Sequence, residues 1–178
     1  MSKNIHSKLF ASLIITLIFA TGYYYNSNDH GSDKFSIMVA GSSEIDLQDF
    51  RSSLSNIVNQ SQSLTKSYSD ETGKWLSHQY DNSTFVSITD SYIPKFENLV
   101  KIAQNLTYPT HYKYVYDALV NSLQSETDSN KHFRNFVQSG NKTEDQISID
   151  LTSKAWQYEM IYSKFLSTPL QNSSQTVT

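Results

Sequence analysis

The sequence predicts an all-α protein, in which an N-terminal apolar helix precedes an up-down-up-down four-helix bundle. Apolar residues recur three and four positions apart in four long segments, which is the periodicity of amphipathic helices. Short stretches rich in Gly, Pro, Asn and Ser separate these segments. One run alternates as a strand does, "TFVSIT" at residues 84–89, but no hairpin turn supplies it with a partner. Because short connections make neighbouring helices antiparallel, a bundle is the simplest arrangement.

The first element is the apolar run "LFASLIITLIFATGYYY", from Leu9 to Tyr25. Lys3 and Lys8 precede it and no acidic residue occurs before Asp29, a pattern that the export machinery recognises. A helix of this length covers about 25 Å, close to the ~30 Å hydrocarbon core of a bilayer. We expect residues 9–28 to form a signal-anchor, with residues 1–8 in the cytoplasm and the rest of the chain outside the cell membrane.

Two alternatives to a retained anchor follow from the same residues. Small residues in "ATG" suit a signal peptidase, so cleavage near Ala20 or Gly22 would release a secreted protein. The run could also be a buried helix of a globular domain. The three tyrosines at 23–25 favour retention, because an aromatic belt lies at the level of the lipid headgroups.

Composition excludes several classes of function. With no cysteine, the chain has no disulfide, no thiol nucleophile and no thiolate metal site. All 17 acidic residues lie beyond Asn28, so the exported part is more negative than the whole chain's formal charge of −3. No basic stripe is present, and we expect no nucleic-acid partner. Twelve Tyr and nine Phe predict a packed core.

A linker at residues 29–42 leads to the first bundle helix, expected at about 44–80 with Ser43 as its N-cap. Its predicted buried stripe consists of Leu47, Phe50, Leu54, Ile57, Ser61, Leu64, Tyr68 and Trp75. Gly73 is the weakest position, because glycine costs a helix about 1 kcal/mol. If the helix splits there, a three-helix bundle with an appendage is the competing arrangement.

The second helix is expected at residues 83–106, with Asn82 or Ser83 as its cap. Pro94 lies inside its stripe and predicts a kink or a fresh start, because proline removes one backbone hydrogen bond. The third helix, at 110–138, follows Pro109, and Gly140 stands where a glycine commonly ends a helix.

The fourth helix, at 144–167, has a capping box in which Thr143 and Gln146 are three residues apart. Pro169 stops it. The bundle therefore occupies residues 43–168, and a disordered tail is expected at 169–178.

One charged residue stands in a predicted buried stripe. Glu126 lies on the third helix where an apolar residue is expected, and Asn130 follows one turn later. Folding the chain back at its loops predicts that Trp75, Trp156 and Asp90 lie at the same level. One interpretation is a core-edge carboxylate bonded to a Lys or Trp N–H. The other is a small pocket in which two indoles and a carboxylate hold a cationic or sugar-like ligand.

Catalytic and metal motifs are absent from the sequence. It has no Glu-x-x-His pair, nucleophile elbow, phosphate loop or His-Glu-x-x-His, so we expect neither an enzyme nor a cofactor. His78, His111 and His132 fall within the bundle and leave a metal-handling bundle as a lesser alternative. Asp128 and His132 have i, i+4 spacing, which is typical of an exposed helix contact.

Export would make five Asn-x-Ser/Thr sequences eligible for N-glycosylation. They begin at Asn59, Asn82, Asn105, Asn141 and Asn172.

The segment "YPTHYKYVYDALVNSLQSETDSNKHFRNFVQSGN", followed by "AWQYEMIYSKFL", resembles small, N-terminally anchored helical proteins of prokaryotes with no assigned function. The resemblance covers Ile93 to about Leu166 and depends on pattern. The shared features are a Pro before the third helix, Leu119 and Val120, Glu126, Phe133 and Phe136, the Gly turn, and a Tyr-Glu pair in the last helix. It implies a bundle outside the cell and transfers no catalytic residue.

Together these features predict a partner-binding or structural module on the cell surface. It is held by Leu9 to Tyr25 and contacts a protein partner that the sequence does not name. The alternative is a ligand-binding or sensing bundle with its pocket at the level of Glu126, Trp75 and Trp156.

Overall fold

The computed structural model describes residues 44–169, and all regular secondary structure in this part of the chain is helical. Its helices are α2 (Glu44–Leu76), α3 (Asn82–Gln104), α4 (Lys113–Ser139) and α5 (Lys142–Ser167), with a single 3-10 turn, η1 (Thr110–Tyr112), before α4. The predicted all-α, four-helix arrangement is confirmed. The predicted anchor, the linker and residues 170–178 lie outside the described residues. None of the helices described is both long and apolar enough to cross a membrane.

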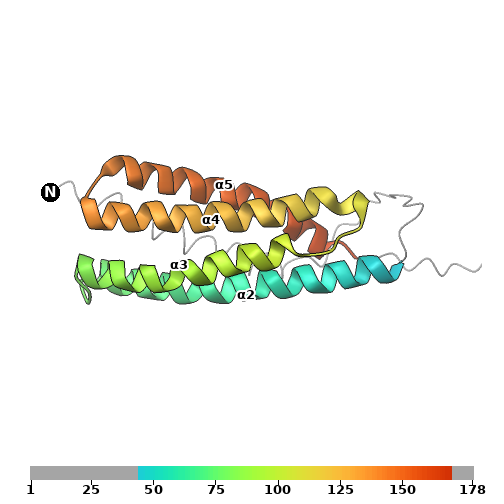
Figure 1. Ribbon diagram of the computed structural model, residues 1–178, viewed down its shortest axis with the longest axis horizontal. Helices are drawn as coiled ribbons and strands as arrows, with labels where there is room; N and C mark the ends of the chain where they lie inside the picture. Colours follow the sequence, from blue (N-terminus) through green and yellow to red (C-terminus); the bar gives the residue numbers. More distant parts are fainter. Residues whose placement is uncertain (1–43, 170–178) are drawn as a thin grey trace, which may run out of the picture.

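The helices form an elongated bundle in which each helix runs opposite to the one before it (Figure 1). The helix α4 packs against both α3 and α5, and α2 packs against α3. Near the beginning of α2, the guanidinium of Arg51 donates hydrogen bonds to the carbonyl oxygens of Leu166 and Thr168, at the end of α5. A cation there is favoured by the negative end of the helix dipole. Arg51 thereby links the first helix of the bundle to the last.

Small side chains line the contact between α4 and α5. They recur four and three residues apart on both helices: Ala118, Ser122, Ser125 and Ser129 on α4, and Ser148, Thr152 and Ala155 on α5. Ser129 Oγ donates to the Ser148 carbonyl at 2.8 Å, and Ser148 Oγ donates to the Ser129 carbonyl at 2.9 Å. Small side chains allow two helix backbones to approach closely, and here the approach brings hydroxyls within reach of the opposite backbone.

The helix ends use local chemistry that the sequence predicts in part. Gly140 has φ 71°, the left-handed conformation that favours glycine, and it ends α4 as predicted. The predicted N-caps of α3 and α5 are wrong, and Ser43, the predicted cap of α2, lies outside the described residues. Asp81 caps α3 by accepting from Thr84 N at 2.7 Å, and Asn141 caps α5 by accepting from Thr143 N at 3.0 Å. The helix α3 begins one residue earlier than expected and α5 two residues earlier, because these side-chain oxygens accept from the free N–H groups of the first turn.

Neither predicted helix break occurs. The helix α2 continues through Gly73 to Leu76, so the three-helix alternative is wrong, and residues 77–81 form the turn in which His78 has φ 62°. Thr72 and Tyr68 are buried just before Gly73, and their packing outweighs the low helix propensity of one glycine. The helix α3 likewise continues through Pro94, which is exposed between the buried Thr89 and Phe96.

Two apolar clusters fill the bundle, one towards each end. The Phe50 cluster contains Phe50, Leu54, Ile57, Val58, Val100, Ala103, Val115, Leu119, Leu123, Tyr162, Phe165 and Leu166. The Phe85 cluster contains Tyr68, Phe85, Val86, Phe96, Phe133 and Val137. Between them lies a polar layer, which we define as Ser61 and Thr65 of α2, Ser122, Glu126, Ser129 and Asn130 of α4, and Thr152 and Glu159 of α5.

Removing a ring from the Phe85 cluster should destabilise the bundle strongly. The Phe85 ring is fully buried and lies 5.0 Å from the Trp75 ring and 6.0 Å from the Phe133 ring, between centroids. We expect Phe85→Ala to lower the free energy of unfolding by about 3–5 kcal/mol in denaturant titrations. Tyr114→Ala is the matched control, because Tyr114 is 56% exposed and its loss should change stability by less than about 0.5 kcal/mol. Equal effects of the two substitutions would contradict the packing described.

Candidate functional site

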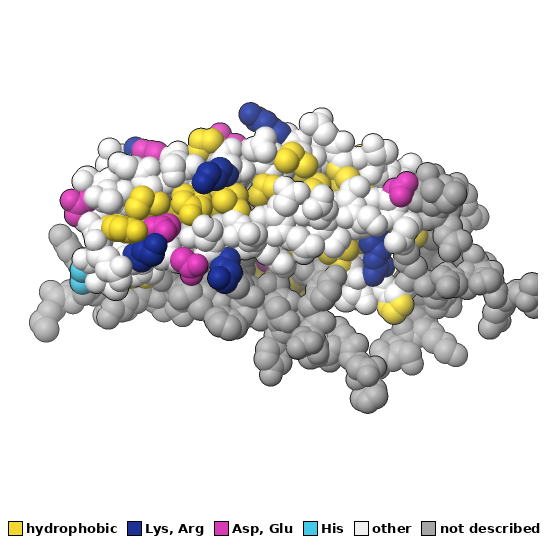
Figure 2. Space-filling view, turned by 90° about the horizontal axis from the view of Figure 1, so that it is seen from below, with side chains coloured by type: hydrophobic (Ala, Val, Ile, Leu, Met, Phe, Trp, Pro, Cys, Tyr) yellow, Lys and Arg dark blue, Asp and Glu magenta, His cyan; other side chains and the backbone are white. Residues whose placement is uncertain are grey.

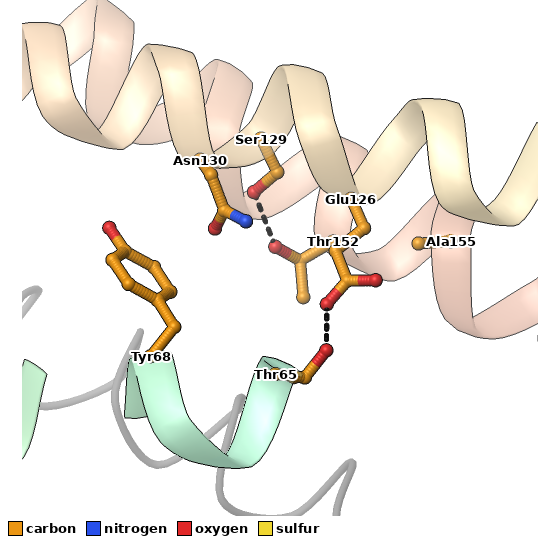
Figure 3. Close-up of a pocket in the computed structure, with 7 residues that line it drawn as sticks. All are labelled: Thr65, Tyr68, Glu126, Ser129, Asn130, Thr152 and Ala155. Carbon is orange, nitrogen blue, oxygen red and sulfur yellow. Dashed lines mark hydrogen bonds between the residues drawn. The ribbon is translucent and has the colours of Figure 1, made fainter. Parts of the chain in front are cut away.

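The polar layer encloses a small cavity at the middle of the bundle. The cavity measures about 20 Å³ and is bordered by α2, α4 and α5 (Figure 3). Its lining residues are Thr65, Tyr68, Glu126, Ser129, Asn130, Thr152 and Ala155. One water needs roughly 10–15 Å³ of such space, so the cavity has room for a single water and not for a sugar or an organic cation.

Glu126 reaches across this cavity from α4 to α2. Its carboxylate accepts hydrogen bonds from the hydroxyls of Thr65 and Ser61, the latter at 3.4 Å. Figure 3 shows the Glu126 side chain pointing from α4 towards Thr65. The sequence predicted a Lys or Trp N–H as the partner, and that prediction is wrong. Of the two α2 residues that bond Glu126, Ser61 belongs to the buried stripe of the helix, and Thr65 is half-buried one turn later.

Two opposing effects set the protonation of Glu126. Burial raises the pKa of its carboxyl to about 7, because a charge is poorly solvated inside the bundle. The hydrogen bonds from Thr65 and Ser61 act in the other direction, because hydroxyl donors stabilise the ionised form. Burial is the larger of the two effects, so the Glu126 carboxyl keeps its proton to a higher pH than an exposed glutamate does.

A second carboxyl, that of Glu159, projects from α5 into the same layer. Its side chain is 7% exposed, and no hydrogen bond reaches it from any described residue. Burial and, to a lesser extent, repulsion from Glu126 raise the pKa of Glu159 to about 8. Burial followed by the charge on Glu159 also raises the pKa of the neighbouring Tyr162 hydroxyl well above its usual range. Glu159 belongs to the Tyr-Glu pair of the resemblance but was not predicted as a site residue. Its spacing from Ala155 and Tyr162, four and three residues, was the signal that placed it in a buried stripe.

Asn130 completes the site. Its side chain is 4% exposed, lines the cavity, and points from α4 towards α2 one helical turn from Glu126 (Figure 3). The amide nitrogen Nδ2 makes no hydrogen bond to any described residue. A buried amide N–H without an acceptor costs about 1–3 kcal/mol. The site thus presents an unused donor beside a carboxyl group.

The other predicted site residues lie elsewhere. Trp75 stacks on Phe85 and donates from Nε1 to Asn82 Oδ1 at 3.0 Å, and it lies ten residues, about 15 Å, along α2 from Thr65. Trp156 is 44% exposed. It follows Ala155, which lines the cavity, and one helical step of about 100° turns it away. Asp90 forms a two-point ion pair with Arg134, with distances of 2.9 and 3.0 Å. Of the four residues, only Glu126 lines the cavity.

The histidines do not converge. His78 and His111 are exposed, and His132 Nδ1 pairs with Glu144 of α5 at 2.7 Å. The predicted contact of Asp128 with His132 is absent, because Asp128 accepts from Gln124 at 2.9 Å and pairs with Lys131 at 3.5 Å. Within residues 44–169, no three His, Cys, Asp or Glu side chains form a group that could hold a metal ion.

Four of the predicted glycosylation sites can be placed. Asn59, Asn82, Asn105 and Asn141 are exposed, and Asn172 lies outside the described residues. The Asn82 amide also donates to the Val137 carbonyl at 3.2 Å, and the Asn105 amide donates to the Lys101 carbonyl at 2.9 Å. Asn59 lies on the exposed side of α2, and its neighbour Ser61 is buried in the polar layer.

The fold and site together define a helical bundle with an acidic, partly hydroxyl-lined interior site. Comparison with protein families, with characterised proteins and with solved structures finds no match to this chain.

The carboxyl pair should make the bundle less stable at alkaline pH. Both folded-state pKa values lie above the usual Glu value of about 4.3, so the folded protein binds more protons than the unfolded chain between about pH 4.3 and 8. Stability therefore falls as pH rises through this window and is level above it. We expect Glu159→Gln to be more stable than the wild type at pH 9 by on the order of 2 kcal/mol, and nearly equal to it at pH 4.

The measurement is the free energy of unfolding in urea at pH 4, 6, 7.5 and 9. Glu97→Gln is the matched control, because Glu97 lies at the surface beside Lys131, at 2.9 Å, and its loss should bring no alkaline gain. A wild-type stability that stays level from pH 5 to 8.5 would rule out the raised pKa values.

Proposed function

We propose that the protein is a membrane-anchored, extracytoplasmic helical bundle that acts by binding a protein partner. The basic residues Lys3 and Lys8 ahead of the apolar run Leu9 to Tyr25 support the anchor and its orientation. The resemblance to N-terminally anchored helical proteins supports the same location. The partner-binding role depends on one observation, the composition of the exposed side of α5.

The exposed side of α5 carries an unusual set of side chains. We define the α5 outer face as Lys154, Trp156, Met160, Ile161 and Lys164. Trp156 is 44% exposed, Met160 54% and Ile161 40%, and Trp156 and Met160 are four residues apart and therefore adjacent on the helix. Both lysines are exposed, whereas Glu159, the single acidic residue of α5 from Ser153 onwards, is buried. This face is apolar and positive in a chain with a net negative charge.

Other faces of the bundle differ from it. On the face made by α2 and α3, hydrophobic side chains form a broken band along the long axis, with basic and acidic side chains beside it (Figure 2). Lys66 and Asp70 on α2, for example, lie within 3.8 Å of each other. Charges of both signs on that face compensate one another. Among the described residues neither Lys154 nor Lys164 of the α5 outer face forms an ion pair, and the exposed Asp150, one turn before Lys154, accepts instead from Gln146 at 2.9 Å.

These properties specify the chemistry of the partner. Tryptophan and methionine are enriched where proteins bind each other, and a tryptophan buried in a partner's pocket is a typical energetic centre of an interface. Charges at the rim select partners of opposite sign and speed association. We infer a protein partner with an apolar pocket for Trp156 and Met160 and an acidic rim that meets Lys154 and Lys164.

The test begins with the full-length chain in host membranes. A photo-crosslinking amino acid at position 161 should yield a discrete adduct with one protein, which is then purified and its affinity for the chain measured. We expect Trp156→Ser and Met160→Ser each to weaken that affinity at least tenfold, since interface anchors of this kind contribute about 2 kcal/mol or more. Their thermal stability should stay near that of the wild type, because both side chains are exposed.

Ile102→Ser is the matched control, because Ile102 is 39% exposed on α3 and its loss should leave the affinity unchanged. An affinity that is insensitive to Trp156 and Met160 would overturn the proposed surface. A lipid surface is the competing outcome. In a Trp75→Phe background, a shift of Trp156 fluorescence on adding anionic vesicles, with no partner present, would assign the face to the membrane instead.

The anchor is tested separately, by intact mass and alkaline carbonate washing of host membranes. We expect the full-length mass to remain in the washed membrane, because an inserted apolar helix resists extraction. Recovery in the soluble fraction of a chain that begins near Thr21 or Tyr23 would show cleavage after Ala20 or Gly22 and a secreted protein.

A further inference from the structure

The cavity in the polar layer presents one donor and one carboxyl that the protein does not pair with each other. Asn130 Nδ2 is buried without an acceptor, and Glu126 receives hydroxyl donors from α2 on one side only. Both side chains line the same cavity of about 20 Å³. An unpaired amide donor calls for a guest atom that accepts a hydrogen bond, and a partly protonated carboxyl can accept from that guest or donate to it.

A single water fits both requirements. The cavity has room for it, and its oxygen can accept from Asn130 Nδ2. Its two hydrogens can be donated to the Glu126 carboxyl and to the hydroxyl oxygen of Thr152 or Ser129, which line the same cavity. Buried waters in proteins typically make about three such bonds. Glu159, in the same layer, has no hydrogen-bond partner among the described residues, and the charged group that acts on its carboxyl is Glu126.

We propose that the polar layer holds one long-lived water in this cavity and one proton on its two carboxyl groups. The water accepts from Asn130 Nδ2 and bonds the Glu126 carboxyl, and the Glu126–Glu159 pair retains one proton at neutral pH. Two carboxylates without a cation between them would place two charges in a poorly solvated interior, and one proton removes one of these charges. Glu126 ionises more readily than Glu159, because the hydroxyls of Thr65 and Ser61 donate to its carboxylate. The proton therefore resides mainly on Glu159.

The groups around the pair reinforce this assignment. Tyr68 of α2 lines the cavity, and Tyr162 of α5 is buried beside the pair, so both are neutral at physiological pH. No side chain of α3 lines the cavity, and the lining residues include no Lys, Arg or His. No positive side chain of the lining therefore competes with the proton for the pair.

The water is tested in the wild-type full-length chain by NMR. We expect the Asn130 side-chain amide protons to show cross-peaks to water that have opposite signs in NOE and ROE spectra, the signature of a buried water and not of hydrogen exchange. Asn130→Leu should abolish the site by filling it with an apolar group. Asn121→Leu is the matched control, since Asn121 is exposed on the same helix. Absence of these cross-peaks in the folded wild type would overturn the water site.

The proton is tested by following the carboxyl carbons of Glu126 and Glu159 from pH 4 to 10 in the same protein. We expect one of the two carboxyls to remain mostly protonated at pH 7. Glu126→Gln should lower the titration midpoint of Glu159, because it removes the neighbouring charge that opposes ionisation of Glu159. Full ionisation of both carboxyls at pH 6 would overturn the proposal.

A metal cation is the remaining competitor for this site. The titration is repeated in sodium chloride and in choline chloride of equal ionic strength. Midpoints that agree in the two salts support a proton. Midpoints that fall in sodium alone would show that a small cation occupies the site, and would overturn its assignment to water and a proton.

Discussion

The arrangement of this bundle depends on how it accommodates two carboxyl groups in its interior. A charge buried among helices must be neutralised or hydrogen-bonded. No basic side chain enters the lining of the cavity; hydroxyl groups donate to Glu126, and burial raises the pKa of both carboxyls. Glu126 joins α4 to α2 through Thr65 and Ser61, and the small residues around Ser129 and Thr152 hold α4 close to α5. The polar layer therefore sets the register of three helices, and the two aromatic and aliphatic clusters fill the space on either side of it.

Helix α5 serves two surfaces at once. Ala155 and Glu159 face the interior, whereas the residues that follow each of them, Trp156 and Met160, face away from it. This alternation follows from the helix itself, because adjacent residues are turned by about 100°. The interior side carries the acidic groups and the exterior side carries the indole, the thioether and the lysines. The polar layer and the proposed contact surface therefore lie on opposite sides of one helix, within a single turn of each other.

Much of the fold was predictable, and the errors have definite causes. The four helices lie close to their predicted ranges because the apolar periodicity is strong, and Gly140 ends α4 because its left-handed conformation suits glycine. The caps were misplaced because Asp81 and Asn141 compete with neighbouring polar residues for the same N–H groups. Gly73 and Pro94 were overrated as breaks, because local propensity is weak against the packing of a long buried stripe. For the candidate site, Glu126 and Asn130 were found from their positions in a stripe, but their neighbours were not.

The sequence by itself determined that the described part is helical, that Glu126 stands where a buried residue belongs, and that an apolar run precedes the bundle. These properties follow from the order of residues along one helix or one segment. Only the tertiary structure decided that Thr65 and Ser61, and not a lysine or a tryptophan, meet Glu126, and that Glu159 lies beside it. Such partners depend on the height and rotation of one helix against another. Side-chain packing across the bundle sets both quantities, and no pattern within a single helix records them.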